Sequence, residues 1–204
     1  MVDLRLTTLT VVNKADRLGR DEPMLWTMFL ELSLTTLNSH QFVVTTDPLA
    51  GKLPKAGKGD TVTIPAGVGR YQRSAGGIFL VGVIAAAFEN DLRTAQQIKD
   101  GYAAGAAELN QAILDHFAAH GFVKPDDMQQ KAIGDRVAAE VKATVIAAHG
   151  GLVALLGGTA LGSDKKFYEL TGASLNESLT LNFAAKKDRA VYRVSGSLNF
   201  VKPT

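Results

Sequence analysis

The stretch Gly76-Gly-Ile-Phe-Leu-Val-Gly-Val-Ile-Ala-Ala-Ala-Phe88 marks the place where the pattern of this sequence changes. It is a continuous apolar run followed by Glu89-Asn-Asp91, which is typical of a central strand buried on both faces. Its alanines leave a helix as the alternative. Before this run the residues alternate as in strands, and after it apolar residues recur at helical spacing.

Two helices are predicted after this strand. Thr94-Ala-Gln-Gln97 fits a capping box, with Asp91 as an alternative cap, and Gly121 ends the first helix. Asp126 and Gln129 begin the second helix in the same way. Apolar residues form one stripe on each helix: Ile98, Tyr102, Leu109, Ile113 and Phe117 on the first, and Ile133, Val137, Val141, Val145 and Ile146 on the second. We therefore expect an antiparallel helical hairpin whose stripe packs on the strands.

Strand-like segments lie on both sides of the helices, and the last two read as a hairpin. They cover about residues 4–12, 24–34, 41–46, 60–64, 178–183 and 190–201. The predicted fold class is α+β: an antiparallel β-sandwich with an inserted helical hairpin. We expect a single domain over 1–204, with the sandwich formed by 1–90 and 163–204 and the helical insertion by 91–162.

Composition excludes several kinds of chemistry. The chain has 204 residues, is 46% apolar and has a net charge of +2, which gives no field that would imply nucleic acid as a partner. It contains no cysteine, so disulfides and thiolate metal sites are excluded. No phosphate-binding glycine loop is present, and no cofactor is expected. The N-terminus lacks the pattern of a secretory signal, which predicts a cytoplasmic protein or one exported without a classical signal peptide.

Two small groups of polar residues are candidates for chemistry. His116 and His120 lie one helical turn apart, as metal ligands can, although two histidines ending an amphipathic helix explain the same spacing. Glu89 and Asp91 follow a buried strand, where carboxylates often reach a ligand. Helix capping by Asp91 is the competing interpretation.

The loop after the first strand carries a family resemblance. Leu9-Thr-Val-Val, then Ala15-Asp16-Arg-Leu18, then Asp21-Glu22-Pro23 and a strand with an aromatic residue resemble the opening of synaptotagmin-type calcium-and-lipid-binding domains. The resemblance covers about 30 residues and implies a β-sandwich with functional loops at one end. It implies calcium ligation by Asp16 and Asp21, beside Glu22. In the place of the family's second acidic loop, Gly162-Ser-Asp164-Lys-Lys offers one carboxylate with two lysines.

Two uncharged runs predict either core segments or membrane-active ones. They are Ser74 to Phe88 and Ala143 to Gly162, the latter interrupted only by His149 and ending in Gly158-Thr-Ala-Leu-Gly162. Many glycines and short length make both poor spanning helices, so we interpret them as a core strand and a core helix. Within the second run, Gly150–Gly162 is predicted to form a short helix or a tight turn region.

Three function classes remain open. The preferred one is a non-catalytic binding or interaction module for a protein or small-molecule ligand. Its contacts would come from the loops Asn13–Pro23, Asp47–Asp60 and Gly162–Gly172. A membrane-active or pore-forming protein using the helical insertion is the alternative. A hydrolase-type enzyme is third.

Overall fold

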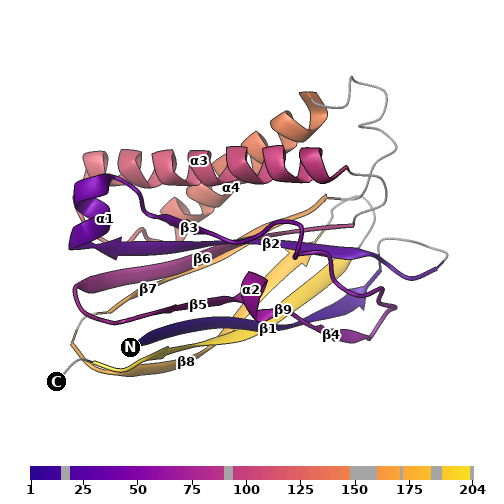
Figure 1. The fold of residues 1–204 in the computed structure, drawn as a ribbon, viewed down its shortest axis with the longest axis horizontal. Helices are drawn as coiled ribbons and strands as arrows, with labels where there is room; N and C mark the ends of the chain where they lie inside the picture. The colour runs from indigo at the N-terminus through magenta and orange to yellow at the C-terminus, as the bar shows by residue number, and fades with distance from the viewer. Residues whose placement is uncertain (15–18, 90–93, 148–159, 171, 185–189, 203–204) are drawn as a thin grey trace.

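The computed structural model describes residues 1–14, 19–89, 94–147, 160–170, 172–184 and 190–202. Within these ranges the chain forms two antiparallel sheets and four helices (Figure 1). The prediction of a mixed α and β structure with antiparallel sheets is confirmed.

The first sheet joins the two ends of the chain. Its strand order is β4-β1-β9-β8, and β5 also pairs with β1. The strands are β1 (Val2–Asn13), β4 (Thr61–Thr63), β5 (Arg70–Arg73), β8 (Leu175–Ala184) and β9 (Val191–Phe200). Pairing of β1 with β9 runs from Val2 opposite Phe200 to Asn13 opposite Val191. The expectation that the last hairpin would pair with the N-terminal strand is therefore confirmed.

The second sheet is built around the predicted central strand. Its order is β3-β2-β6-β7, with β2 (Pro23–Ser33), β3 (Val43–Thr45), β6 (Ile78–Glu89) and β7 (Ala160–Glu169). Strand β6 is paired along both edges, and all its residues from Leu80 to Phe88 are buried. Burial on both faces explains why this stretch is apolar without alternation.

The two faces of β6 contact different groups of residues. Val81, Val83, Ala85 and Ala87 belong to a core shared by both sheets. The first sheet contributes to that core from its inner side, with Leu4, Leu9, Tyr192, Val194 and Leu198 among its members. Leu80, Ile84, Ala86 and Phe88 belong to the other core, which lies under the long helices. Alternation along the strand thus divides its side chains between two apolar layers.

The two long helices begin where their caps predict. Helix α3 (Ala95–His120) starts after Thr94, whose side chain accepts a hydrogen bond from the Gln97 amide while Gln97 Oε1 accepts one from the Thr94 amide. It ends at Gly121, which has a φ of 76°. Helix α4 (Asp127–Ala147) begins with the same reciprocal pair between Asp126 and Gln129. These local signals were sufficient because a cap needs only neighbouring residues.

Helices α3 and α4 cover the outer side of the second sheet (Figure 1). The predicted stripe of α3 is buried there together with Trp26, Met28 and Leu30 of β2. A Cβ on Gly105 would lie 2.6 Å from Val141 of α4 and 2.9 Å from Met28, so glycine allows this close approach. The short helices α1 (Leu34–Ser39) and α2 (Ala66–Gly69) follow β2 and precede β5.

Two sequence-based expectations need correction. Residues Gly162–Gly172 were predicted as a contact loop, but most of them form β7, which also takes residues 160–162 out of the predicted helical insertion. The expected short helix or turn over Gly150–Gly162 is also wrong at its C-terminal end, where β7 begins at Ala160; its other residues, 150–159, lie outside the described residues.

The irregular segment Asp47–Asp60 is bonded along the edge of β2. The amide of Leu25 donates to the carbonyl of Gly51 at 2.9 Å, and Leu53 donates to Pro23 at 2.9 Å. Asp21 and Ala56 exchange backbone hydrogen bonds of 2.9 and 3.0 Å. The predicted loop therefore runs alongside β2 and is hydrogen-bonded to it. Its Gly, Pro and Lys content did not indicate this pairing.

Candidate functional site

The outer side of the first sheet is a polar surface built on several paired strands. Polar side chains alternate with the core residues on every strand of this sheet, so they share one face. We call it the polar sheet face. Its members are Asp3, Arg5, Thr8, Thr10, Thr61, Thr63, Arg70, Gln72, Asn176, Ser178, Thr180, Asn182, Arg193, Ser195, Ser197 and Asn199.

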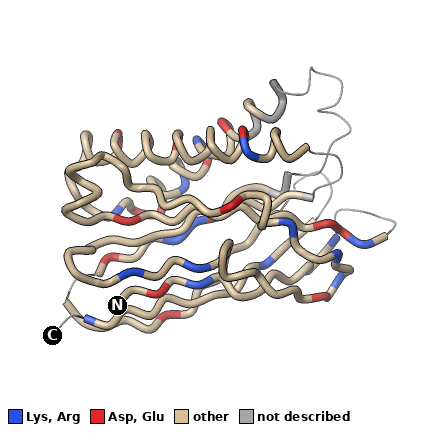
Figure 2. Tube along the Cα trace, in the orientation of Figure 1, with Lys and Arg blue, Asp and Glu red and all other residues tan. Residues whose placement is uncertain are grey.

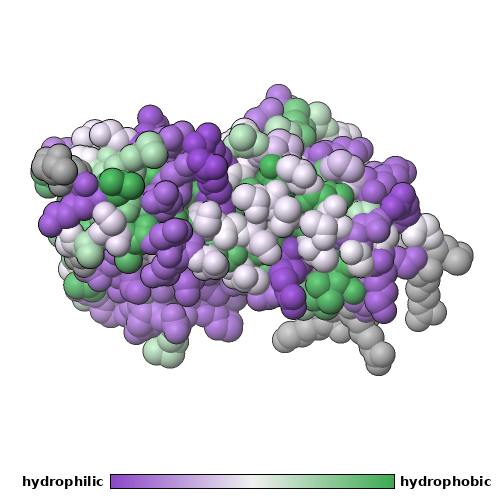
Figure 3. Space-filling view, turned by 90° about the horizontal axis from the view of Figure 1, so that it is seen from below, coloured by the Kyte–Doolittle hydropathy of each residue, from purple (hydrophilic) through white to green (hydrophobic). Residues whose placement is uncertain are grey.

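Strand register arranges the small polar groups of this face in rows. Thr63, Thr8, Ser195 and Thr180 are successive cross-strand partners on β4, β1, β9 and β8. Neighbouring strands are about 4.8 Å apart, which sets the spacing along the row. Figure 3, which views the molecule from this side, shows a mainly hydrophilic and intermediate surface with smaller hydrophobic areas.

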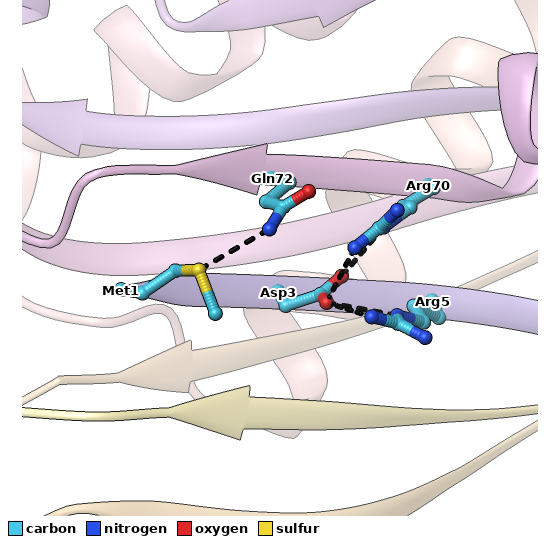
Figure 4. Close-up of polar contacts among 5 residues, drawn as sticks. All are labelled: Met1, Asp3, Arg5, Arg70 and Gln72. Atoms are coloured by element: carbon cyan, nitrogen blue, oxygen red, sulfur yellow. Dashed lines mark hydrogen bonds and ion pairs between the residues drawn. The ribbon is translucent and has the colours of Figure 1, made fainter.

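A carboxylate between two guanidinium groups lies at the N-terminal end of this face (Figure 4). Asp3 is only 3% exposed, although it lies opposite the core side of β1. Arg70 Nε donates to Asp3 Oδ1 at 3.0 Å and its Nη2 donates to Oδ2 at 2.9 Å. Arg5 donates to Oδ2 from Nε at 2.8 Å and also from Nη2. In Figure 2 the acidic position of β1 near the N-terminus lies beside basic positions of β1 and β5.

These contacts favour the ionised form of Asp3. The hydrogen bond from Arg5 is the largest cause, burial opposes it, and the bond from Arg70 and the charges of both arginines add to it. Together they hold the pKa of Asp3 well below its usual range. Because β1 and β5 each contribute one arginine, the cluster also connects these two strands.

Asp3→Asn is expected to lower the free energy of unfolding at pH 7 by about 1 to 2 kcal/mol, because charge-assisted hydrogen bonds to two arginines are lost. The folded-state pKa of Asp3 is depressed, so its contribution is complete above the unfolded pKa near 3.8 and is lost as pH falls through the folded value. The difference between variant and parent should therefore shrink in strong acid. Urea unfolding of both proteins at pH 7 and at low pH measures the difference in their free energies of unfolding.

Asp135→Asn is the matched control for that experiment. Asp135 pairs with Lys131 across one helical turn, and both side chains are about two-thirds exposed. Its replacement is expected to change stability little at either pH. If Asp3→Asn changed the free energy of unfolding at pH 7 no more than this control does, the cluster would not stabilise the fold.

The structure separates the acidic residues that the loop pattern grouped together. Asp21 is fully buried, and its Oδ2 accepts a hydrogen bond of 2.8 Å from the Tyr192 hydroxyl. Glu22 forms ion pairs with Lys55 at 2.6 Å and Lys52 at 3.6 Å, and the Lys55 hydrogen bond is the main cause of its lowered pKa. Asp16 lies outside the described residues.

The other predicted carboxylates have separate positions. Asp164 accepts hydrogen bonds from the Asn182 amide at 2.8 Å and the Lys165 amide at 2.9 Å, and so connects β7 with β8. Glu89 ends β6 opposite Pro23, and its side chain is outside the described part of the chain, as is all of Asp91. No hydrogen bond or ion pair between described residues joins Asp164 to Asp21 or Glu22.

The two histidines lie together near the end of α3. Their ring centroids are 5.0 Å apart, and His116 Nε2 is 3.0 Å from the carbonyl oxygen of Val123. Asp115 pairs with Arg136 of α4 at 2.8 Å. Over the ranges that the structure describes, no three His, Asp or Glu residues are grouped as metal ligands.

The sequence reasoning missed the polar sheet face. Alternation in Val2-Asp-Leu-Arg-Leu6 placed Asp3 and Arg5 on one face of a strand. It could not identify Arg70, because the side-chain contact between Asp3 and Arg70 joins residues 67 positions apart in the sequence. Comparison of the chain with protein-family models, curated proteins and solved structures found no match.

Proposed function

We propose that the two sheets form a β-sandwich into which α3 and α4 are inserted as a hairpin. The shared apolar core between the sheets supports the sandwich. Strands β6 and β7 are neighbours in one sheet, and both long helices lie between them in the sequence, which supports an insertion. In this architecture the polar sheet face is the outer side of one sheet, and none of the described helices covers it (Figure 1).

We propose that the protein is a non-catalytic binding module whose contact surface is the polar sheet face. The observation that carries this proposal is the register of hydroxyl and amide groups across β4, β1, β9 and β8. Strands hold such groups more precisely than loops do, so a ligand meets donors and acceptors that are already ordered. A polar, hydrated ligand fits this chemistry best.

The difference between the two sheets supports the choice of this face. The outer side of the second sheet is apolar and is covered by α3 and α4. The corresponding side of the first sheet is polar, and Arg5, Arg70 and the serine and threonine residues there remain accessible. The end loops 13–23 and 47–60 stay a prediction as an additional contact region.

The membrane-active alternative has no comparable support. The apolar run Ser74–Phe88 is accounted for by the central position of β6, which is paired on both edges. None of the described helices is both long and apolar enough to cross a bilayer.

Blocking the polar sheet face is the direct test. Since the chain has no cysteine, a single introduced thiol can be labelled uniquely with a bulky polyethylene glycol maleimide. Ser178→Cys places the label on the face, and Ala118→Cys places it on the exposed side of α3. Affinity electrophoresis would use gels containing neutral dextran, an acidic polysaccharide or polylysine. We expect retardation by at least one polymer, lost only when the label is at position 178.

Three results would contradict the binding proposal. The first is no retardation by any polymer, and the second is equal loss of retardation with both labels. The third is robust leakage of dye-loaded liposomes by the unlabelled protein, which would favour the membrane-active alternative instead.

A further inference from the structure

In the cluster of Asp3 with Arg5 and Arg70, both guanidinium groups keep donors that Asp3 does not use. Arg5 and Arg70 are cross-strand partners, and each binds the carboxylate through Nε and Nη2. No hydrogen bond joins Nη1 of either arginine to another described residue. The side chains are 48% and 35% exposed, so these donors are accessible. Asp3 therefore holds both arginines in place while neutralising only one of their charges.

The charge balance of the polar sheet face is positive. Its described members include three arginines, Arg5, Arg70 and Arg193, against the single carboxylate of Asp3. Arg193 makes one long hydrogen bond, from Nε to Asn182 Oδ1 at 3.4 Å. Asp3 is almost completely buried beneath its arginines, so an approaching ligand meets the guanidinium groups first.

The neutral hydroxyl groups between the arginines limit which class of anionic ligand fits the face. Ser178, Ser197, Thr8 and Thr180 lie on the same face and can exchange hydrogen bonds with hydroxyl groups. No aromatic residue is among the members of the face, so it lacks the stacking platform that single-stranded nucleic acids need. Met1 lies at the edge of the face, where its sulfur accepts a hydrogen bond of 3.2 Å from Gln72 Nε2, and every member of the face has a polar side chain.

We propose that the polar sheet face binds an acidic polysaccharide, whose carboxylate or sulfate groups contact Arg5, Arg70 and Arg193 while its hydroxyl groups contact the serine and threonine rows. This inference depends on the proposed binding function and specifies its ligand class. Planar guanidinium groups match carboxylate and sulfate groups through paired hydrogen bonds, which gives the face its selectivity for anions.

The test measures binding of the full chain to a polyuronate, heparin, neutral dextran and a single-stranded DNA oligonucleotide by isothermal titration calorimetry. We expect binding to the polyuronate or to heparin, and these two distinguish a carboxylate from a sulfate source. Binding should weaken with added salt, because exposed charges are screened. Arg193→Gln should weaken it by at least about threefold, and the triple variant Asp3→Asn, Arg5→Gln, Arg70→Gln by at least about tenfold.

The controls separate this inference from the binding function itself. Lys131→Gln removes an exposed charge on α4 and should leave affinity unchanged. The triple variant removes the buried carboxylate together with its arginines, and thermal melting verifies its folding; Arg193→Gln tests the same idea without touching the cluster. Equal binding to dextran would overturn the acidic ligand class while leaving the binding function intact. Preference for DNA, loss of affinity in Lys131→Gln, or no binding to either polyanion would also overturn it.

Discussion

Ile113→Asp is expected to lower the free energy of unfolding by about 3 kcal/mol or more, since it buries a carboxylate that has no partner. Ile113 is fully buried in the core between α3 and the second sheet. That core also contains Leu30, Ile84 and Phe117, whose side chains have no group that can pair with a charge. Urea unfolding monitored by circular dichroism would measure the change.

Ala103→Asp is the matched control on the same helix. Ala103 is exposed and lies one turn after Lys99, so a carboxylate there meets water and an opposite charge. We expect a change within about 0.5 kcal/mol. If Ile113→Asp unfolded at the same urea concentration as this control, the apolar stripe of α3 would not be part of the cooperative core.

Gly196→Ala is expected to destabilise the protein by about 3 kcal/mol, at the upper end of overpacking effects. A Cβ at this position would lie 1.9 Å from the carbonyl oxygen of Arg5 on the paired strand. The register between β1 and β9 shifts at Leu6 and Thr8, next to this contact. Because the obstacle is backbone rather than a flexible side chain, the strands themselves would have to separate.

Gly76→Ala provides the comparison for Gly196→Ala. No atom lies within 4 Å of a Cβ at Gly76, and its φ is not in the left-handed region. This substitution should be neutral or slightly stabilising, because alanine restricts the unfolded chain. Thermal unfolding of both variants is the measurement. Equal melting temperatures would show that the β1–β9 contact can relax without cost.

Local signals in the sequence predicted the helices better than the site. The ends of α3 and α4 depend on Thr94, Gln97, Asp126 and Gln129, which interact within four residues of one another. The central position of β6 could be predicted for a similar reason, because burial on both faces removes alternation from the strand itself.

The roles of the polar residues depended on distant partners. Asp21 resembled a loop ligand, but it is buried because the Tyr192 hydroxyl, 171 positions away, binds it. Gly162-Ser-Asp-Lys-Lys166 has the composition of a turn, and only its pairing with β6 makes it a strand. The cluster of Asp3 with Arg5 and Arg70 likewise requires β5 beside β1, and no local sequence pattern specifies that pairing.

The bonds along the sheet margins bear on how the protein behaves at high concentration. An unpaired strand edge is a template for another chain, and proteins that leave it open are prone to aggregate. Here the segment 47–60 occupies backbone groups of β2, and the Asp164 carboxylate accepts the outward amide of Asn182 on β8. Asp164, which the sequence analysis proposed as a ligand residue, thus occupies a backbone donor that a foreign strand would need in order to pair with β8 at Asn182.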